Sequence, residues 1–156
     1  MPIFMPKQGC GMIIPSNVCV NPDVPWFAQQ VLGGGEVKYL LLQRGWGAPT
    51  SPGHWGGPGG LRDPEEYPEE TAIRETFEET GGGIVIKSSA LLFEGQLDDR
   101  RLTYFVATSY EVSAEPIQLR KTDGVLESIG MGWFTRKQAL RLDLSFLWSE
   151  AISLLP

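Results

Sequence analysis

A long loop rich in glycine and proline leads straight into an acidic helix, and these two segments constrain the fold of this 156-residue chain more than any other feature. Residues 45–68 hold seven of the nineteen glycines and five of the twelve prolines, which excludes regular structure over most of the segment. Pro68 suits the first position of a helix, and Gly81 suits its left-handed end. Because a loop of this length inside a compact domain is usually functional, we expect the loop and the helix to build one site.

The helix predicted over 68–80 has two unlike faces when its residues are placed at ~100° per step. Glu75, Glu78 and Glu79 lie at i, i+3 and i+4 spacing, so their carboxylates converge. Such a face is either a solvated acidic surface or a set of hard oxygen ligands for a divalent cation. The residues expected to face the core are Ala72, Ile73, Thr76, Phe77 and Thr80.

The complete spacing of this region matches a family signature. Gly60 is followed after five residues by Glu66 and, after seven more, by the run Arg-Glu-Thr-Phe-Glu-Glu-Thr-Gly at 74–81. The segment 60–82 resembles the Nudix box GX5EX7REUXEEXGU, where U is a bulky aliphatic residue, and the chain is identified as a MutT-like member of the Nudix hydrolases. Thr76 and Gly82 depart from the pattern, since each stands at a position of type U.

The resemblance implies an α/β fold, a Nudix-type α/β/α sandwich with a mixed β-sheet between helices, in a single domain over 1–156. The residue patterns themselves predict an irregular insert at about 15–36. A capping box at 135–138 predicts a short helix through Leu142, and the apolar spacing after Asp143, which includes Phe146, predicts a last helix. Strands are predicted at 11–14, 37–43, 84–86, 91–93, 102–112 and 132–134.

The resemblance also implies a metal site for Mg²⁺ or Mn²⁺. Glu78 and Glu79 are the expected principal ligands, and Glu75 is either a further ligand or the base that activates water. The backbone carbonyl of Gly59 or Gly60 is expected to supply a neutral ligand. These assignments agree with the chemistry of hard oxygen donors, which suit both cations.

Other candidates surround this set. The resemblance implies that Arg74 orients the neighbouring Glu75 and that Glu127, in an acidic loop, is a further metal ligand or the general base. The alternative for Glu127 is a solvated loop acid. Arg44 ends an apolar strand and is a candidate contact for a substrate phosphate. Trp55 and Trp46 are placed either to stack on a nucleobase or to cap the core.

The resemblance implies a metal-dependent pyrophosphohydrolase that cleaves a nucleoside diphosphate linked to another group. The first expectation is hydrolysis of a nucleoside or deoxynucleoside triphosphate to the monophosphate and pyrophosphate. The alternatives are an ADP-ribose or nucleotide-sugar pyrophosphatase and, in another class, a non-catalytic nucleotide sensor. The partner is then a small nucleotide, and a homodimer stays open.

Charge and cysteine content limit the remaining function classes. The net charge of −6 and the lack of a basic track argue against an extended nucleic acid or an anionic membrane as partner. The N-terminal segment lacks a basic stretch followed by a long apolar run, and two cysteines in a chain of this size suggest reduced thiols. We therefore expect a cytoplasmic protein without a membrane span.

Overall fold

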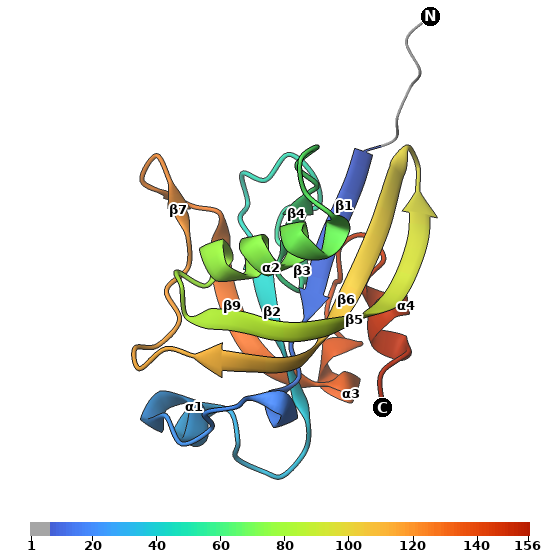
Figure 1. The fold of residues 1–156 in the computed structure, drawn as a ribbon. Helices are drawn as coiled ribbons and strands as arrows, with labels where there is room; N and C mark the ends of the chain where they lie inside the picture. Colours follow the sequence, from blue (N-terminus) through green and yellow to red (C-terminus); the bar gives the residue numbers. More distant parts are fainter. Residues whose placement is uncertain (1–6) are drawn as a thin grey trace, which may run out of the picture.

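The computed structural model describes residues 7–156 (Figure 1). The prediction of a cytoplasmic protein rests in part on the first six residues, which lie outside the described residues. No helix within 7–156 is both long and apolar enough to cross a membrane. The strands are β1 (Lys7–Ile13), β2 (Lys38–Arg44), β3 (Trp55–Gly56), β4 (Gly59–Leu61), β5 (Ile84–Leu97), β6 (Arg100–Val112), β7 (Lys121–Thr122), β8 (Val125–Leu126) and β9 (Ser128–Thr135). The helices are η1 (Ser16–Val18, a 3₁₀ helix), α1 (Pro25–Gln30), α2 (Pro68–Glu79), α3 (Arg136–Ala139) and α4 (Trp148–Ser153).

The strands form two sheets and a separate hairpin. One sheet has the order β4-β1-β6-β5, in which β1 and β6 run parallel and the other neighbours run antiparallel. The second sheet has the order β3-β2-β9 and is antiparallel throughout. Strands β7 and β8 pair only with each other among the described residues. This arrangement confirms the predicted α/β class with a mixed sheet.

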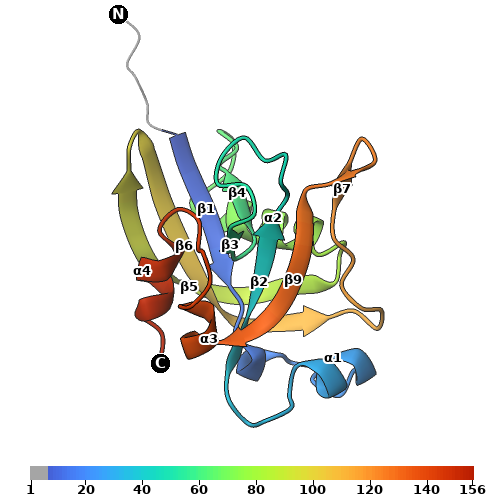
Figure 2. The ribbon, with the colours of Figure 1, turned by 180° about the vertical axis from the view of Figure 1, so that it is seen from behind.

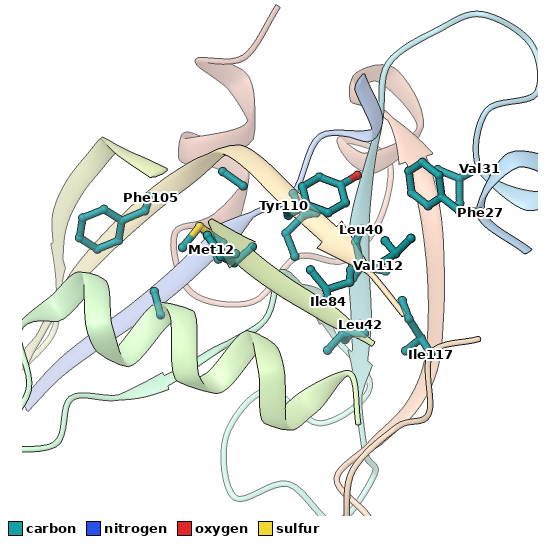
Figure 3. Packing of buried hydrophobic residues seen from close by; sticks show 14 of the residues in the cluster. Met12, Phe27, Val31, Leu40, Leu42, Ile84, Phe105, Tyr110, Val112 and Ile117 are labelled. Carbon is teal, nitrogen blue, oxygen red and sulfur yellow. The ribbon is translucent and has the colours of Figure 1, made fainter. Parts of the chain in front are cut away.

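Helices cover the sheets from opposite sides (Figures 1 and 2). Helix α2 packs on β1, β4 and β5, whereas α3 and α4 lie on the other side. Each side has its own buried apolar cluster. Met12, Leu40, Ile84 and Tyr110 belong to the cluster shown in Figure 3, and Trp148 belongs to the second. Helix α2 is therefore held in place by its packing on the β4-β1-β6-β5 sheet.

Helix α2 ends where its sequence predicts. The N–H of Gly82 donates to the carbonyl of Phe77 at 2.8 Å, and the N–H of Gly81 donates to Glu78 at 3.2 Å. This Schellman pair needs the left-handed backbone that Gly81 adopts, with φ of 62°. The predicted core face is correct for Ala72, Thr76 and Thr80, but Phe77 is 49% exposed because it covers Gly82 at the helix end instead of entering the core.

Two predicted irregular or interrupted regions are more regular than expected. The insert at 15–36 contains η1 and α1, because Pro25 opens a helix that buries Trp26 and Phe27. The strands predicted at 84–86 and 91–93 are one strand, β5, which follows β6 along its length through bulges near Ser88 and between Leu91 and Phe93.

Near the C-terminus the predicted helices are shorter. The capping box at Thr135 is confirmed, since its Oγ1 accepts from the N–H of Gln138 at 3.2 Å, but α3 ends at Ala139 instead of Leu142. Helix α4 begins at Trp148, because Phe146 has a φ of 50° and so lies outside any right-handed helix.

The loop glycines bring backbone very close to its neighbours. A Cβ on Gly59 would lie 2.5 Å from the carbonyl oxygen of Cys10, and one on Gly60 would lie 2.7 Å from Cδ of Glu75. Gly56 and Gly57 approach the Trp148 ring in the same way, at 2.5 and 2.7 Å. The segment therefore fits between β1, α4 and the acidic helix only without side chains.

Candidate active site

A pocket of about 950 Å³ opens beside the acidic helix and is lined from both sheets. Glu75 and Glu79 of α2 form part of its wall, next to Gly59 and Gly60 of β4. Residues of the 45–50 loop, the hairpin β7–β8 and the segment before α4 complete the lining. The expected pairing of the loop with the helix is thus observed, and the two build one site.

Arg74 fixes the acidic residues at the back of this site. Its guanidinium donates to both carboxylate oxygens of Glu66, at 2.9 and 3.0 Å, and also to Glu75 at 3.0 Å and Glu78 at 3.2 Å. The hydrogen bond from Arg74 holds the pKa of the Glu66 carboxyl below its usual value. A planar fork of this kind orients carboxylates better than a lysine. Arg74 therefore lies where the sequence predicts, touching Glu75.

Glu79 joins helix α2 to the glycine-rich loop, because its carboxylate accepts a hydrogen bond from the loop backbone. Burial raises the pKa of its carboxyl well above the ordinary value, and the charge of Glu75 raises it further, while the N–H of Gly59, which donates to Glu79 Oε1 at 3.0 Å, acts in the opposite direction. A desolvated carboxylate beside a second one favours a cation or a proton nearby. Gly59 contributes here through its N–H.

Arg120 is a site residue that our sequence reasoning missed. Its guanidinium donates to Glu78 at 2.8 Å, to Glu75 at 3.4 Å and to Glu127 at 2.6 Å. Burial lowers the pKa of Arg120, but its hydrogen bond to Glu127 and the carboxylate charges raise it on balance. One guanidinium therefore joins helix α2 to the loop that carries Glu127.

The sequence contains a turn signal that could have predicted the contact between Arg120 and Glu127. Asp123-Gly124 is a typical two-residue hairpin turn, and β7–β8 pairs Lys121 with Leu126, which places Arg120 opposite Glu127. The N–H of Glu127 donates to the carbonyl of Arg120 at 3.2 Å. Reading that hairpin in the sequence would have brought the arginine to the predicted site.

Glu127 lines the pocket and is held by two donors. Thr122 Oγ1 donates to its Oε1 at 2.5 Å, and Arg120 contacts its Oε2. Burial raises the pKa of this carboxyl, but the bonds from Thr122 and Arg120 lower it on balance. The side chain is 40% exposed, so both the catalytic interpretation and that of a solvated loop acid stay open.

The donor set suits a hard divalent cation. Within residues 7–156 no three His, Cys, Asp or Glu side chains are arranged to hold a metal ion. In this arrangement the Arg120 guanidinium lies among Glu75, Glu78 and Glu127 and pairs with each of them. The carboxylates themselves, on one helix face and with Glu79 desolvated, are the oxygen ligands that Mg²⁺ and Mn²⁺ take.

Of the remaining candidates, two line the pocket and one packs in the core. Arg44 lines the pocket, and so does Trp46, which is 72% exposed. Trp55 is not among the lining residues: its ring packs edge-on against Phe134, with centroids 5.3 Å apart, in the second core cluster. Trp55 therefore packs against the core in this structure, and its expected contact with a substrate stays a prediction.

The comparisons with known proteins agree with this geometry. A structure of a MutT NUDIX hydrolase from Burkholderia pseudomallei has a TM-score of 0.69 at 24% identity, covering 98% of this chain and 100% of that chain. The NUDIX domain of Shewanella oneidensis NrtR, complexed with ADP-ribose, has a TM-score of 0.66 at 19% identity, covering 97% and 87%. A Caenorhabditis elegans Ap4A hydrolase has a TM-score of 0.59 at 22% identity, covering 96% and 92%.

These structural likenesses establish the fold. The comparison with curated proteins found no match. The family model described as the NUDIX domain matches residues 31–153, which is most of the chain and contains the whole segment 60–82. The chain therefore belongs to the NUDIX family of hydrolases, as its sequence signature predicts.

Proposed function

We propose that this Nudix hydrolase is a metal-dependent pyrophosphohydrolase acting on a nucleoside diphosphate linked to another group, with a nucleoside or deoxynucleoside triphosphate as the first candidate substrate. The observation that carries the proposal is the composition of the pocket. Glu75 and Glu79 share it with Arg44, Arg100 and Arg120. Acids that suit a divalent cation, together with guanidiniums that suit phosphate oxygens, fit a small polyphosphate.

The residues that would hold Mg²⁺ or Mn²⁺ are Glu75, Glu78 and Glu79, with the carbonyl of Gly59 or Gly60 as a neutral ligand. When bound, such a cation supplies positive charge that stabilises phosphate oxygens and activates water. The residues' own contribution is to hold the carboxylates in place. Arg74 donates one hydrogen bond to Glu75 and one to Glu78, and two further bonds to Glu66 fix the guanidinium itself.

The reaction consumes one water molecule. Its oxygen bonds to phosphorus, the bridging P–O bond breaks, and a triphosphate gives the monophosphate and pyrophosphate. One water proton passes to a carboxylate and then to solvent. Glu75 is the first candidate for this base because Arg74 orients it, and Glu127 is the second because it lines the pocket from the opposite loop.

ADP-ribose or a nucleotide sugar is the second candidate substrate. The Shewanella oneidensis NUDIX domain, which shares this fold, was solved with ADP-ribose. The pocket volume of about 950 Å³ accommodates ligands of either class. The two candidates differ chemically, since ADP-ribose has no phosphate beyond the two joined by the scissile bond.

The test is a product-identified screen of the purified protein with Mg²⁺ against triphosphates, ADP-ribose, nucleotide sugars and dinucleotides. We expect turnover that stops in excess chelator and returns with Mg²⁺ or Mn²⁺. Glu78→Gln should lower turnover by orders of magnitude, whereas Glu69→Gln, an exposed acid on the same helix, should not. Full activity in chelator contradicts the mechanism. Nucleotide binding without hydrolysis of any compound favours the non-catalytic sensor.

A further inference from the structure

Two arginines in the pocket have no carboxylate partner. Arg44 ends β2 in one sheet, Arg100 begins β6 in the other, and both line the pocket. Among residues 7–156 neither guanidinium forms an ion pair, whereas Arg120 in the same pocket contacts three carboxylates. The acidic side of the pocket is thus already neutralised in part, while its basic side is not.

Phe146 holds these two charges against one ring. The Cζ atom of Arg44 lies 5.3 Å from the ring centroid, and that of Arg100 lies 5.0 Å from it. The negative face of a phenyl ring attracts guanidinium groups. Phe146 reaches this position with a φ of 50°, a left-handed conformation that costs energy for a non-glycine residue and that is typically found at functional sites.

Donors on both arginines are left over for a ligand. Arg44 donates from Nε to the carbonyl of Thr50 at 2.9 Å and from Nη2 to its Oγ1 at 3.2 Å, which fixes the side chain but leaves Nη1 without a partner in the described residues. The Arg100 guanidinium donates to no protein group in that part of the chain. Burial lowers the pKa of Arg44 on balance, although the charge of Glu79 raises it, and the charge of Arg100 lowers it further.

We infer that Arg44, Arg100 and Phe146 form a subsite for a phosphate group of the substrate that lies beyond the scissile pyrophosphate bond. The inference rests on the proposed function and narrows its substrate class. Two guanidiniums match the charge of a terminal phosphate, which is about −2, and bind its oxygens in a forked geometry. The substrate then carries at least three phosphates, which favours a nucleoside triphosphate over ADP-ribose.

The binding test uses inorganic tripolyphosphate and orthophosphate in excess chelator, measured by calorimetry. We expect Arg100→Gln to weaken tripolyphosphate binding about tenfold or more, since a charged hydrogen-bonding partner is removed. Arg100→Lys keeps the charge but loses the forked geometry, so its affinity for tripolyphosphate should lie between those of the wild type and of Arg100→Gln. The matched control is Arg101→Gln, because Arg101 pairs with Glu94 and is not among the pocket-lining residues. Unchanged binding in Arg100→Gln overturns the inference.

The kinetic test separates this inference from the proposed function. With Mg²⁺, Arg100→Gln should raise KM for a triphosphate by a larger factor than KM for ADP-ribose. Equal losses for both compounds overturn the subsite and assign the arginines to the nucleoside part that the two share. If the wild-type protein hydrolyses neither, the proposed function fails, and the tripolyphosphate measurement still decides the subsite.

Discussion

Arg120 provides the most direct test of how the acidic site is balanced. Its guanidinium bonds to Glu75, Glu78 and Glu127, and a divalent cation bound to the two helix acids would compete for the same oxygens. Replacing Arg120 with glutamine removes this competitor. We therefore expect two opposite effects of Arg120→Gln: a lower stability when chelator removes the cation, and a higher affinity for the cation when it is present.

The magnitude follows from the exposure of the three partners. Glu78 and Glu127 are each 40% exposed, and pairs of this kind contribute about 0.2–1 kcal/mol. Glu75 is 11% exposed, which places its pair toward the upper end of that range. Removing all three contacts should cost about 1–2 kcal/mol after solvent screening. That loss corresponds to a Tm about 3–6 °C lower and, through linkage, to a cation affinity about 5–30 times higher.

The assay is thermal unfolding with excess chelator and with saturating Mg²⁺, together with Mn²⁺ binding followed by electron paramagnetic resonance. The stability difference between wild type and Arg120→Gln should shrink once the cation is saturating. Lys121→Gln, which removes the same charge from the next residue of the hairpin, should change neither quantity. The reasoning is refuted if Arg120→Gln binds Mn²⁺ no more tightly and melts at the wild-type temperature in chelator.

Three further predictions concern neighbouring groups. Glu127→Gln should lower kcat strongly with little change in KM, as expected for an interaction made mainly in the transition state, and steady-state kinetics that match wild type would leave Glu127 a solvated loop acid. Arg74→Lys should lower kcat while Tm stays close to that of the wild type, because lysine cannot bond both oxygens of Glu66 while holding Glu75. A clear fall in Tm together with kcat would point to a structural role only. Burial raises the pKa of the Cys10 thiol from 9.0 to about 11, so its contribution to stability is complete below pH 9 and is lost as pH rises toward 11. Iodoacetamide should therefore react slowly with native Cys10 at pH 8, and a rate equal to that of the unfolded chain would contradict this assignment.

The parts of the site that could be predicted are those fixed by local signals. Pro68, the acid spacing and Gly81 define α2 within one short segment, so its bounds and its convergent carboxylates follow from helix geometry alone. The same logic failed for Phe77, because the core face was predicted too wide. Thr76 and Thr80 are fully buried, whereas Phe77, at the edge of that face when residues are placed at ~100° per step, is 49% exposed.

The parts that could not be predicted depend on distant pairings. Arg120 reaches Glu78 and Glu75 across 42 and 45 positions, and no local spacing links them. Trp55 is a second case, because no local signal shows that β3 pairs with β2 and that the Trp55 ring packs against Phe134. Strand pairing, which the sequence does not specify residue by residue, decided both cases.

The glycines beside the acidic helix also determine how this protein tolerates genetic change. Alanine is the smallest substitution available, and even its methyl group would collide with a neighbour at Gly56, Gly57, Gly59 and Gly60. By contrast, Gly33 and Gly47 have no heavy atom within 4 Å of an added Cβ. Glycines of one loop should therefore differ in how fast they change during evolution: Gly56, Gly57, Gly59 and Gly60 should stay nearly invariant, whereas Gly47, like Gly33, should accept other residues.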